Sequence, residues 1–146
     1  MKKHGCSAQE VDDILNKKSG LYGVSGVSSD SRDIEAAVKA GNEQAILAHK
    51  MFVNRVVETV GGYYALMGGA DAVVFAGGIG ENSPETRQEI IDGLAALGLK
   101  LDPEANNSRG EEVKISAPDS SMEVFVIPTD EEVMLARDAY KNLQNA

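Results

Sequence analysis

Three short stretches of the chain carry residue types that could bind a small ligand, and the first of them follows an apolar run. Residues 71–84 read DAVVFAGGIGENSP, so that Gly77, Gly78 and Gly80 stand between this run and Pro84. Glycines permit dihedrals and close approaches that a β-carbon forbids, and N–H groups at a helix start can bind a phosphate, ribose or base. A simple tight turn from strand to helix would use the same glycines, so the local pattern leaves both interpretations open.

The second stretch brings Asp30 and Arg32 together at the start of a helix predicted over residues 28–41. On one interpretation Asp30 caps this helix and Arg32 is solvated. On the other, local carboxylates hold Arg32, which presents its planar guanidinium to a base or a phosphate. Hydrophobic periodicity does not distinguish the two.

The third stretch is acidic and follows a second apolar run. Residues 128–132 read PTDEE, and Thr129 with Glu132 three residues on has the pattern of a capping box. Glu131 then has no role in the cap, and its carboxylate is free for other contacts. Ligands of open α/β sheets bind at the carboxyl ends of the strands. A glycine loop beside an acidic turn at that edge suits a nucleotide with Mg²⁺.

Hydrophobic patterning predicts the elements that position these residues. Apolar runs predict central parallel strands at 72–76 and 123–127, and a 3.6-residue period predicts helices near 8–18, 42–67, 84–97 and 130–143. Ser7 with Glu10 forms a second capping box, and Ser83 is placed to cap the helix that Pro84 opens. Residues 19–29 have the composition of a loop with at most a short strand, and residues 102–110 are turn-like. The fold class is therefore α/β.

The predicted helix 42–67 is apolar on two neighbouring faces. One stripe runs through Ala45, Phe52 and Met67, and the other through Val53 and Val60. A helix of this kind is usually covered on both sides. We expect it to lie between the sheet and either another helix or a second subunit.

Composition bounds the class of protein. The chain has 146 residues, the length of a single domain over 1–146, with a formal net charge of -9 that argues against nucleic acid as a partner. No apolar run is long enough to predict a membrane span. Cys6 is the sole cysteine, which fits a reducing cytoplasm.

One alternative interpretation is a Rossmann-type NAD site of an oxidoreductase. Gly78 and Gly80 open a helix, and Asp102 lies where an acidic ribose ligand would. Ser83, however, occupies the position of the third glycine, and no series of βαβ units completes the sheet. We regard this alternative as the weaker one.

The three stretches together resemble a known family. VSSDSRDI at 27–34, VVFAGGIGENSPETR at 73–87 and VIPTDEE at 126–132 are similar, in order and spacing, to three signature stretches of the acetate kinases. This resemblance implies the carboxy-terminal half-domain of the actin-like, ribonuclease H-like ATPase fold, and ATP or ADP with Mg²⁺ as cofactors. It further implies that Glu131 binds magnesium and that two groups bind adenosine, namely Asp30, Ser31 and Arg32, and Gly78, Ile79, Gly80, Glu81 and Asn82. Ser31 replaces a larger apolar residue that often packs near the adenine in the family.

The resemblance also implies what the chain lacks. Members of the family carry, ahead of the part matched here, a metal-placing asparagine, a phosphate-contacting HLGNG loop, and the residues around the acyl substrate. We therefore expect the carboxy-terminal part of a homodimeric enzyme that converts ATP and acetate, or another short carboxylate, into ADP and acyl phosphate. No residue of this part is expected to be catalytic, and we expect little activity from it alone. A non-catalytic dimerisation or assembly module remains the alternative from another class.

Overall fold

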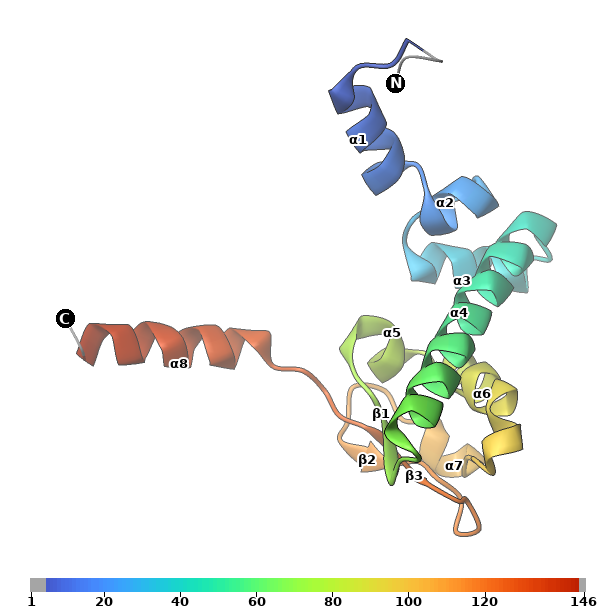
Figure 1. Ribbon diagram of the computed structural model, residues 1–146, viewed down its shortest axis with the longest axis vertical. Helices are drawn as coiled ribbons and strands as arrows, with labels where there is room; N and C mark the ends of the chain where they lie inside the picture. Colours follow the sequence, from blue (N-terminus) through green and yellow to red (C-terminus); the bar gives the residue numbers. More distant parts are fainter. Residues whose placement is uncertain (1–4, 145–146) are drawn as a thin grey trace. The chain divides into compact units, whose positions relative to one another are not determined.

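The computed structural model describes residues 5–144 and divides into two compact units, Met1–Ala65 and Leu66–Ala146 (Figure 1). The first unit is helical, and the second holds all the strands of the described chain. Whether the two units unfold together, as expected of a single domain over 1–146, stays a prediction. Within the described residues, every helix is too short or too polar to cross a membrane.

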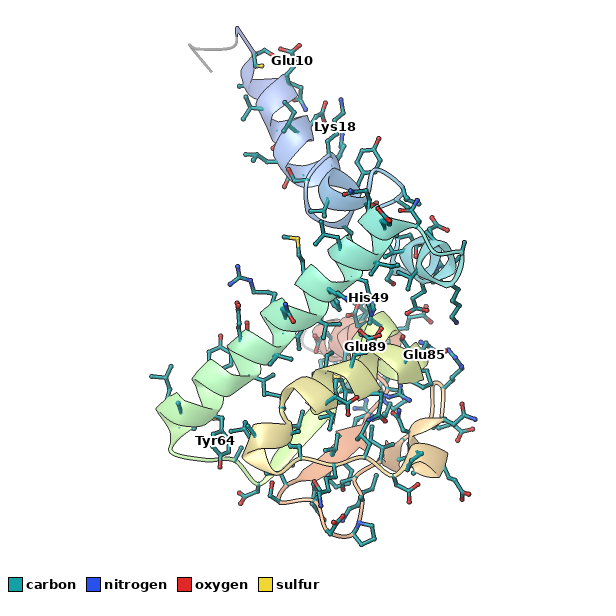
Figure 2. The ribbon with its side chains drawn as sticks, turned by 90° about the vertical axis from the view of Figure 1, so that its right-hand side faces the viewer. Glu10, Lys18, His49, Tyr64, Glu85 and Glu89 are labelled. Carbon is teal, nitrogen blue, oxygen red and sulfur yellow. The ribbon has the colours of Figure 1, made fainter. Side chains whose placement is uncertain are left out.

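The first unit begins with α1 (Ala8–Lys17), whose start was predicted correctly. The side chain of Ser7 accepts a hydrogen bond from the Glu10 N–H at 3.2 Å, and the Ser7 N–H donates to Glu10 Oε2 at 2.7 Å. These reciprocal bonds form the predicted capping box. Figure 2 shows Glu10 in the first turn of α1 and Lys18 just beyond its last turn.

The prediction of a loop over residues 19–29 was wrong, because α2 (Gly20–Ser25) lies there. Gly26 ends this helix with a φ of 66°, a left-handed conformation that favours glycine. A β-carbon at Gly23 would lie 2.9 Å from the carbonyl oxygen of Lys18. The glycines that suggested a loop therefore serve the end of a helix and a close backbone approach.

Two further helices follow, α3 (Ser31–Lys39) and α4 (Glu43–Met67), and the last two residues of α4 belong to the second unit. Helix α4 runs through Gly61 and Gly62 without a break. The buried residues of α4 are Ala45, Ala48 and Val53. In the carboxy-terminal half of α4, Val56, Val60 and Tyr64 are half-buried, whereas Tyr63 is 61% exposed. That a second subunit covers the exposed face stays a prediction.

The second unit contains the mixed three-stranded sheet, in the order β1–β3–β2. Strands β1 (Ala72–Phe75) and β3 (Glu123–Val126) are parallel, with Ala72 opposite Glu123 and Phe75 opposite Val126. Strand β2 (Val113–Lys114) is antiparallel to β3. The predicted α/β class and the parallel pair are confirmed.

The position of β1 differs from the prediction of a strand buried on both faces. It lies at the edge of the described sheet, and Val74 is 51% exposed. A continuous apolar run is typical of a central strand. Within the described residues, β3 is the one strand that pairs with β1.

Helices connect the strands of this unit. After β1 come α5 (Gly77–Asn82), α6 (Pro84–Gly93), a 3₁₀ turn at Ala95–Leu97 and α7 (Pro103–Asn106), and α8 (Glu131–Gln144) follows β3. The helix predicted over 84–97 therefore ends at Gly93, and Gly98 closes the 3₁₀ turn with a φ of 81°. The core of the unit consists of buried side chains from α6, β3 and the segments between them, namely Ile90, Ile91, Leu94, Leu99, Leu101, Ile115, Val124 and Val126.

Candidate nucleotide-binding residues

Asp30 performs both of the roles that the sequence left open. Its Oδ1 accepts the Arg32 N–H at 2.9 Å and so caps α3, while its Oδ2 accepts Arg32 Nη2 at 2.5 Å. The side-chain and backbone hydrogen bonds from Arg32 lower the pKa of Asp30 to about 2. The side chain of Arg32 is nevertheless 86% exposed. A guanidinium that is fixed in direction but open to solvent can stack on a base or bind a phosphate.

The glycine stretch forms a helix, α5, where a bare-backbone loop was predicted. Gly77 begins the helix with a φ of 71°, which a residue with a side chain adopts only at a cost. A β-carbon at Gly80 would lie 3.3 Å from the backbone of Phe75, whereas one at Gly78 would meet nothing within 4 Å. Gly80 therefore allows α5 to pack closely against Phe75, whereas the space beside Gly78 is open.

Glu81 was expected to contact the nucleotide, but one of its carboxylate oxygens accepts hydrogen bonds from within the protein. Its Oε1 accepts the Gly77 N–H at 2.8 Å, the Thr129 N–H at 2.9 Å and the Thr129 hydroxyl at 3.1 Å. These hydrogen bonds, chiefly that from the Thr129 N–H, lower the pKa of Glu81. The structure thus joins the second signature stretch to the third.

Asn82 is engaged at both its side chain and its backbone. Its Nδ2 donates to the Gly78 carbonyl at 3.0 Å, and Arg109 donates to the Asn82 carbonyl. Ile79, which lies between Gly78 and Asn82 in the chain, is half-buried. The side chain of Asn82 is therefore oriented by its own helix.

The acidic turn is capped differently from the prediction. Asp130 Oδ1 accepts the Val133 N–H at 2.9 Å, so Asp130 is the cap of α8 and the Thr129–Glu132 box is wrong. Thr129 does not cap because its hydroxyl and N–H donate to Glu81. Glu131 lies exposed in the first turn of α8, without a capping role, as the sequence led us to expect.

An open hollow of about 430 Å³ lies over this turn, lined by Thr129, Asp130, Glu131, Met134, Leu135 and Asp138. In the part of the chain that the structure describes, no group of three or more His, Cys, Asp or Glu residues could hold a metal ion. An exposed carboxylate nevertheless fits Mg²⁺, which often takes one or two protein carboxylates and fills its other positions with water and phosphate oxygens. Glu131 and its neighbours are chemically suited to that role.

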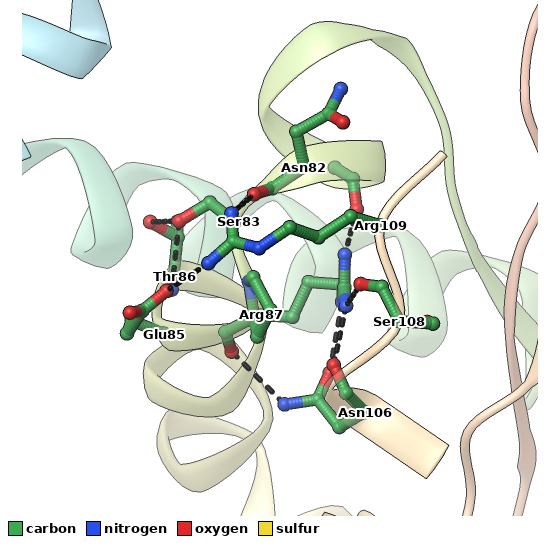
Figure 3. Close-up of polar contacts among 10 residues, drawn as sticks. Asn82, Ser83, Glu85, Thr86, Arg87, Asn106, Ser108 and Arg109 are labelled. Atoms are coloured by element: carbon green, nitrogen blue, oxygen red, sulfur yellow. Dashed lines mark hydrogen bonds and ion pairs between the residues drawn. The ribbon is translucent and has the colours of Figure 1, made fainter. Parts of the chain in front are cut away.

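Arg87 belongs to the second signature stretch, but the sequence did not single it out. Its side chain is fully buried, and Figure 3 shows it at the centre of a polar network. Nη1 donates to the Gly80 carbonyl at 2.7 Å, and Nη2 donates to the Asn106 and Ser108 carbonyls at 2.6 and 2.8 Å. Burial lowers the pKa of Arg87 from its ordinary value. The signal in the sequence was its spacing, three and four residues before the buried Ile90 and Ile91.

The residue proposed as an acidic ribose ligand for the Rossmann alternative has another role. Asp102 Oδ1 accepts the N–H groups of Glu104 and Ala105 at 2.9 and 3.1 Å and so caps α7. Gly78 and Gly80 lie inside α5 and do not form a loop. The roles of Asp102 and of these two glycines in the structure therefore give no support to an NAD site.

Comparison with solved structures identifies the class of protein. The fold matches an acetate kinase of Porphyromonas gingivalis with a TM-score of 0.86 and 46% identity, over 98% of this chain and 36% of that one. It also matches a propionate kinase of Francisella tularensis with a TM-score of 0.82 and 38% identity, over 92% of this chain and 34% of that one. The chain therefore has the actin-like ATPase fold of these kinases, over about a third of their length.

The sequence then identifies the family. The model of the acetokinase family matches residues 1–137, so the chain belongs to that family. The curated acetate kinase of Halothermothrix orenii is 54% identical over 145 residues, which cover 99% of this chain and 36% of that protein. The resemblance found in the three signature stretches is confirmed, and the chain spans little more than a third of the length of the curated relatives it matches.

Proposed function

We propose that this chain is the nucleotide-binding, carboxy-terminal part of an acetate kinase. The observation that carries the proposal is the Asp30–Arg32 pair, in which a carboxylate fixes a guanidinium that stays 86% exposed. An arginine held in this way has lost side-chain freedom before any ligand arrives, so a flat base or a phosphate binds it at a lower entropic cost. The family match over residues 1–137 supports the same conclusion.

Each signature stretch has a proposed role. Asp30, Ser31 and Arg32 contact adenosine, and so does α5 through Gly78, Ile79, Gly80 and Asn82. Glu81, of the same stretch, holds α5 to Thr129 instead. Glu131 binds the nucleotide's Mg²⁺, which neutralises charge on the phosphates when it is bound. The open space beside Gly78 supports a close approach of the ligand to the backbone of α5.

The names of two relatives, acetate kinase and propionate kinase, support a proposal for the parent reaction. We propose reversible phosphoryl transfer between ATP and acetate, or another short carboxylate, in the cytoplasm. Phosphoryl transfer depends chiefly on positioning and on cations around the moving group. Because the chain matches about 36% of its relatives' length, we expect the residues for that step to lie elsewhere in the parent, and little turnover by this chain alone.

Calorimetric titration with ATP and Mg²⁺, and with NAD in parallel, tests the nucleotide assignment. We expect ATP to bind and NAD not to bind. Arg32→Ala should weaken ATP binding about tenfold. Arg55→Ala is the matched control, since Arg55 is also 80% exposed and also paired with a carboxylate, that of Glu58 at 3.4 Å. No binding of ATP, or equal losses in both variants, would contradict the proposal.

Activity is tested separately by trapping acetyl phosphate with hydroxylamine. We expect turnover only when the remainder of an acetokinase chain is supplied. Acetyl phosphate made by this chain alone at an ordinary kinase rate would overturn the proposal that it is inactive by itself.

A second proposed role is homodimer assembly, which α4 favours. Leu47, Met51 and Tyr63 on this helix are 47%, 52% and 61% exposed. This is more exposed apolar surface than a helix in contact with solvent usually has. Light scattering at micromolar concentration should give twice the monomer mass, and Met51→Lys should return it to the monomer mass. A clean monomer from the unaltered chain is the unfavourable outcome.

A further inference from the structure

One oxygen atom of Glu81 connects α5 to the acidic turn. Gly77 is the first residue of α5, Glu81 is the fifth, and Thr129 lies 48 residues beyond Glu81. All three hydrogen bonds described above converge on Glu81 Oε1, one from Gly77 and two from Thr129. The carboxylate therefore fixes the start of the glycine helix and the residue two positions before Glu131 at the same time.

The turn needs such a connection because packing holds it weakly. The last buried residue of β3 is Val126, and the Ile127 N–H still donates to the Phe75 carbonyl at 2.9 Å. From Thr129 through residue 144 every residue is exposed. The two hydrogen bonds from Thr129 to Glu81 thus tie a turn without buried side chains to α5.

A direct contact of Glu81 with the nucleotide fits this geometry less well. Oε1 already accepts three hydrogen bonds and has little capacity for a fourth donor, which leaves only Oε2 of this fixed carboxylate for another contact. The donors to Glu81 lower its pKa and so favour its charged form, and a carboxylate repels phosphate groups. Glu81 is therefore better suited to place other groups than to bind the ligand.

We infer that Glu81 is a positioning residue that couples nucleotide binding at α5 to the placement of the Glu131 carboxylate through Thr129. This inference rests on the proposed nucleotide function. A ligand that orders α5 then also orders the acidic turn, and by linkage Mg²⁺ at the turn raises the affinity for ATP at α5. Loss of the connection should lower this effect of Mg²⁺ without abolishing the adenosine contacts.

The test compares ATP affinity with Mg²⁺ and with EDTA in four chains, namely the unaltered chain, Glu81→Gln, Thr129→Val and Thr129→Ser. Thr129→Ser is the matched control because it keeps the hydroxyl that donates to Glu81. In the unaltered and Thr129→Ser chains Mg²⁺ should raise ATP affinity by at least about fivefold. This ratio should be clearly smaller in Glu81→Gln, which weakens the acceptor, and in Thr129→Val, which loses the hydroxyl donor but keeps the N–H donor. Adenosine, which lacks phosphate, should bind all four chains within about twofold.

A double mutant tests the coupling in a second way. If Glu81 had only a structural role, its substitution would not interact with that of Glu131 in the Mg²⁺ effect on ATP affinity. Glu131→Gln should abolish the Mg²⁺ effect, and adding Glu81→Gln to it should change the ratio no further, since both residues act in one connection. Independent, additive losses would overturn the coupling. A loss of adenosine binding in Glu81→Gln equal to its loss of ATP binding would show a direct contact and would also overturn it.

Amide hydrogen exchange tests the coupling without any substitution, so the test does not depend on the variants folding. Adenosine added to the unaltered chain without Mg²⁺ should slow the exchange of the Thr129 N–H several-fold. Unchanged exchange at Thr129 with adenosine bound overturns the coupling alone. If the unaltered chain binds neither adenosine nor ATP, the proposed function fails, and the inference that rests on it fails with it.

Discussion

The guanidinium of Arg87 holds Asn106 by both its side chain and its backbone. Nε donates to Asn106 Oδ1 at 2.9 Å and Nη2 donates to the Asn106 carbonyl at 2.6 Å, while Asn106 Nδ2 donates to the Pro84 carbonyl at 3.0 Å. A third donor, Nη1, reaches the Gly80 carbonyl. Arg87 therefore joins the end of α7 to the passage from α5 into α6 (Figure 3).

Arg87→Met should destabilise the chain by about 3 kcal/mol. The substitution keeps the apolar stem but leaves the Gly80, Asn106 and Ser108 carbonyls without their donor, and each unpaired buried group costs about 1–3 kcal/mol. Urea unfolding measures the change. Arg109→Met is the control, because the Arg109 side chain is 53% exposed, and it should shift the midpoint far less. Equal shifts for both variants would show that burial of Arg87 is unimportant.

The Asp30 carboxyl should titrate with a pKa of about 2, below its ordinary value of 3.8. Since the folded-state pKa is lowered, the stabilising contribution of this group is present above pH 4 and is lost as the pH falls through about 2. Carboxyl NMR against pH measures the value. In Arg32→Ala the pKa should rise but stay below 3.8, because the backbone N–H at residue 32 still donates to Asp30. A value of 3.8 or higher in the unaltered chain would contradict the pair.

Substitutions of two glycines in α5 should have opposite effects on stability. Gly78→Ala places its methyl in open space and should stabilise the chain by about 0.5–1 kcal/mol, since alanine favours a helix. Gly80→Ala places its methyl 3.3 Å from Phe75 and should destabilise by about 1 kcal/mol. Urea midpoints give both values.

The same pair separates stability from ligand binding. If the nucleotide approaches the backbone at Gly78, the more stable Gly78→Ala variant should bind ATP about tenfold more weakly. Calorimetry measures this affinity. Unchanged affinity in a stabilised Gly78→Ala chain would remove Gly78 from the proposed contacts.

Asp130→Ala should fray the start of α8, whereas Glu132→Ala should leave the helix intact. The reason is that Asp130 Oδ1 accepts the Val133 N–H, and the N-cap acceptor is the side chain that stabilises a helix start. Circular dichroism at 222 nm and amide exchange at Val133 report the change. Loss of helix on Glu132→Ala instead would restore the capping box expected from the sequence.

The sequence determined the features that depend on near neighbours in the chain. Ser7 caps α1, Asp30 caps α3, and Ser83 with Pro84 opens α6, each through contacts within three residues. The apolar runs gave the strands β1 and β3 and their parallel pairing, which helices between them require. Three signature stretches were sufficient to predict the acetokinase family, because their order and spacing are themselves properties of the sequence.

Only the tertiary structure decided the partners that lie far apart in the chain. Thr129 has the sequence pattern of a cap, yet its hydroxyl and N–H donate to Glu81, and this leaves the cap to Asp130. The spacing of Arg87 places it on the buried side of α6, but its partners, the Asn106 and Ser108 carbonyls, are brought to it only by the fold. Hydrophobic period and local propensity report which side of an element is buried, but a hydrogen bond also needs a partner brought near by the fold. That physical difference is why the signature stretches could be found in the sequence, while the link between two of them, at Glu81 and Thr129, could not.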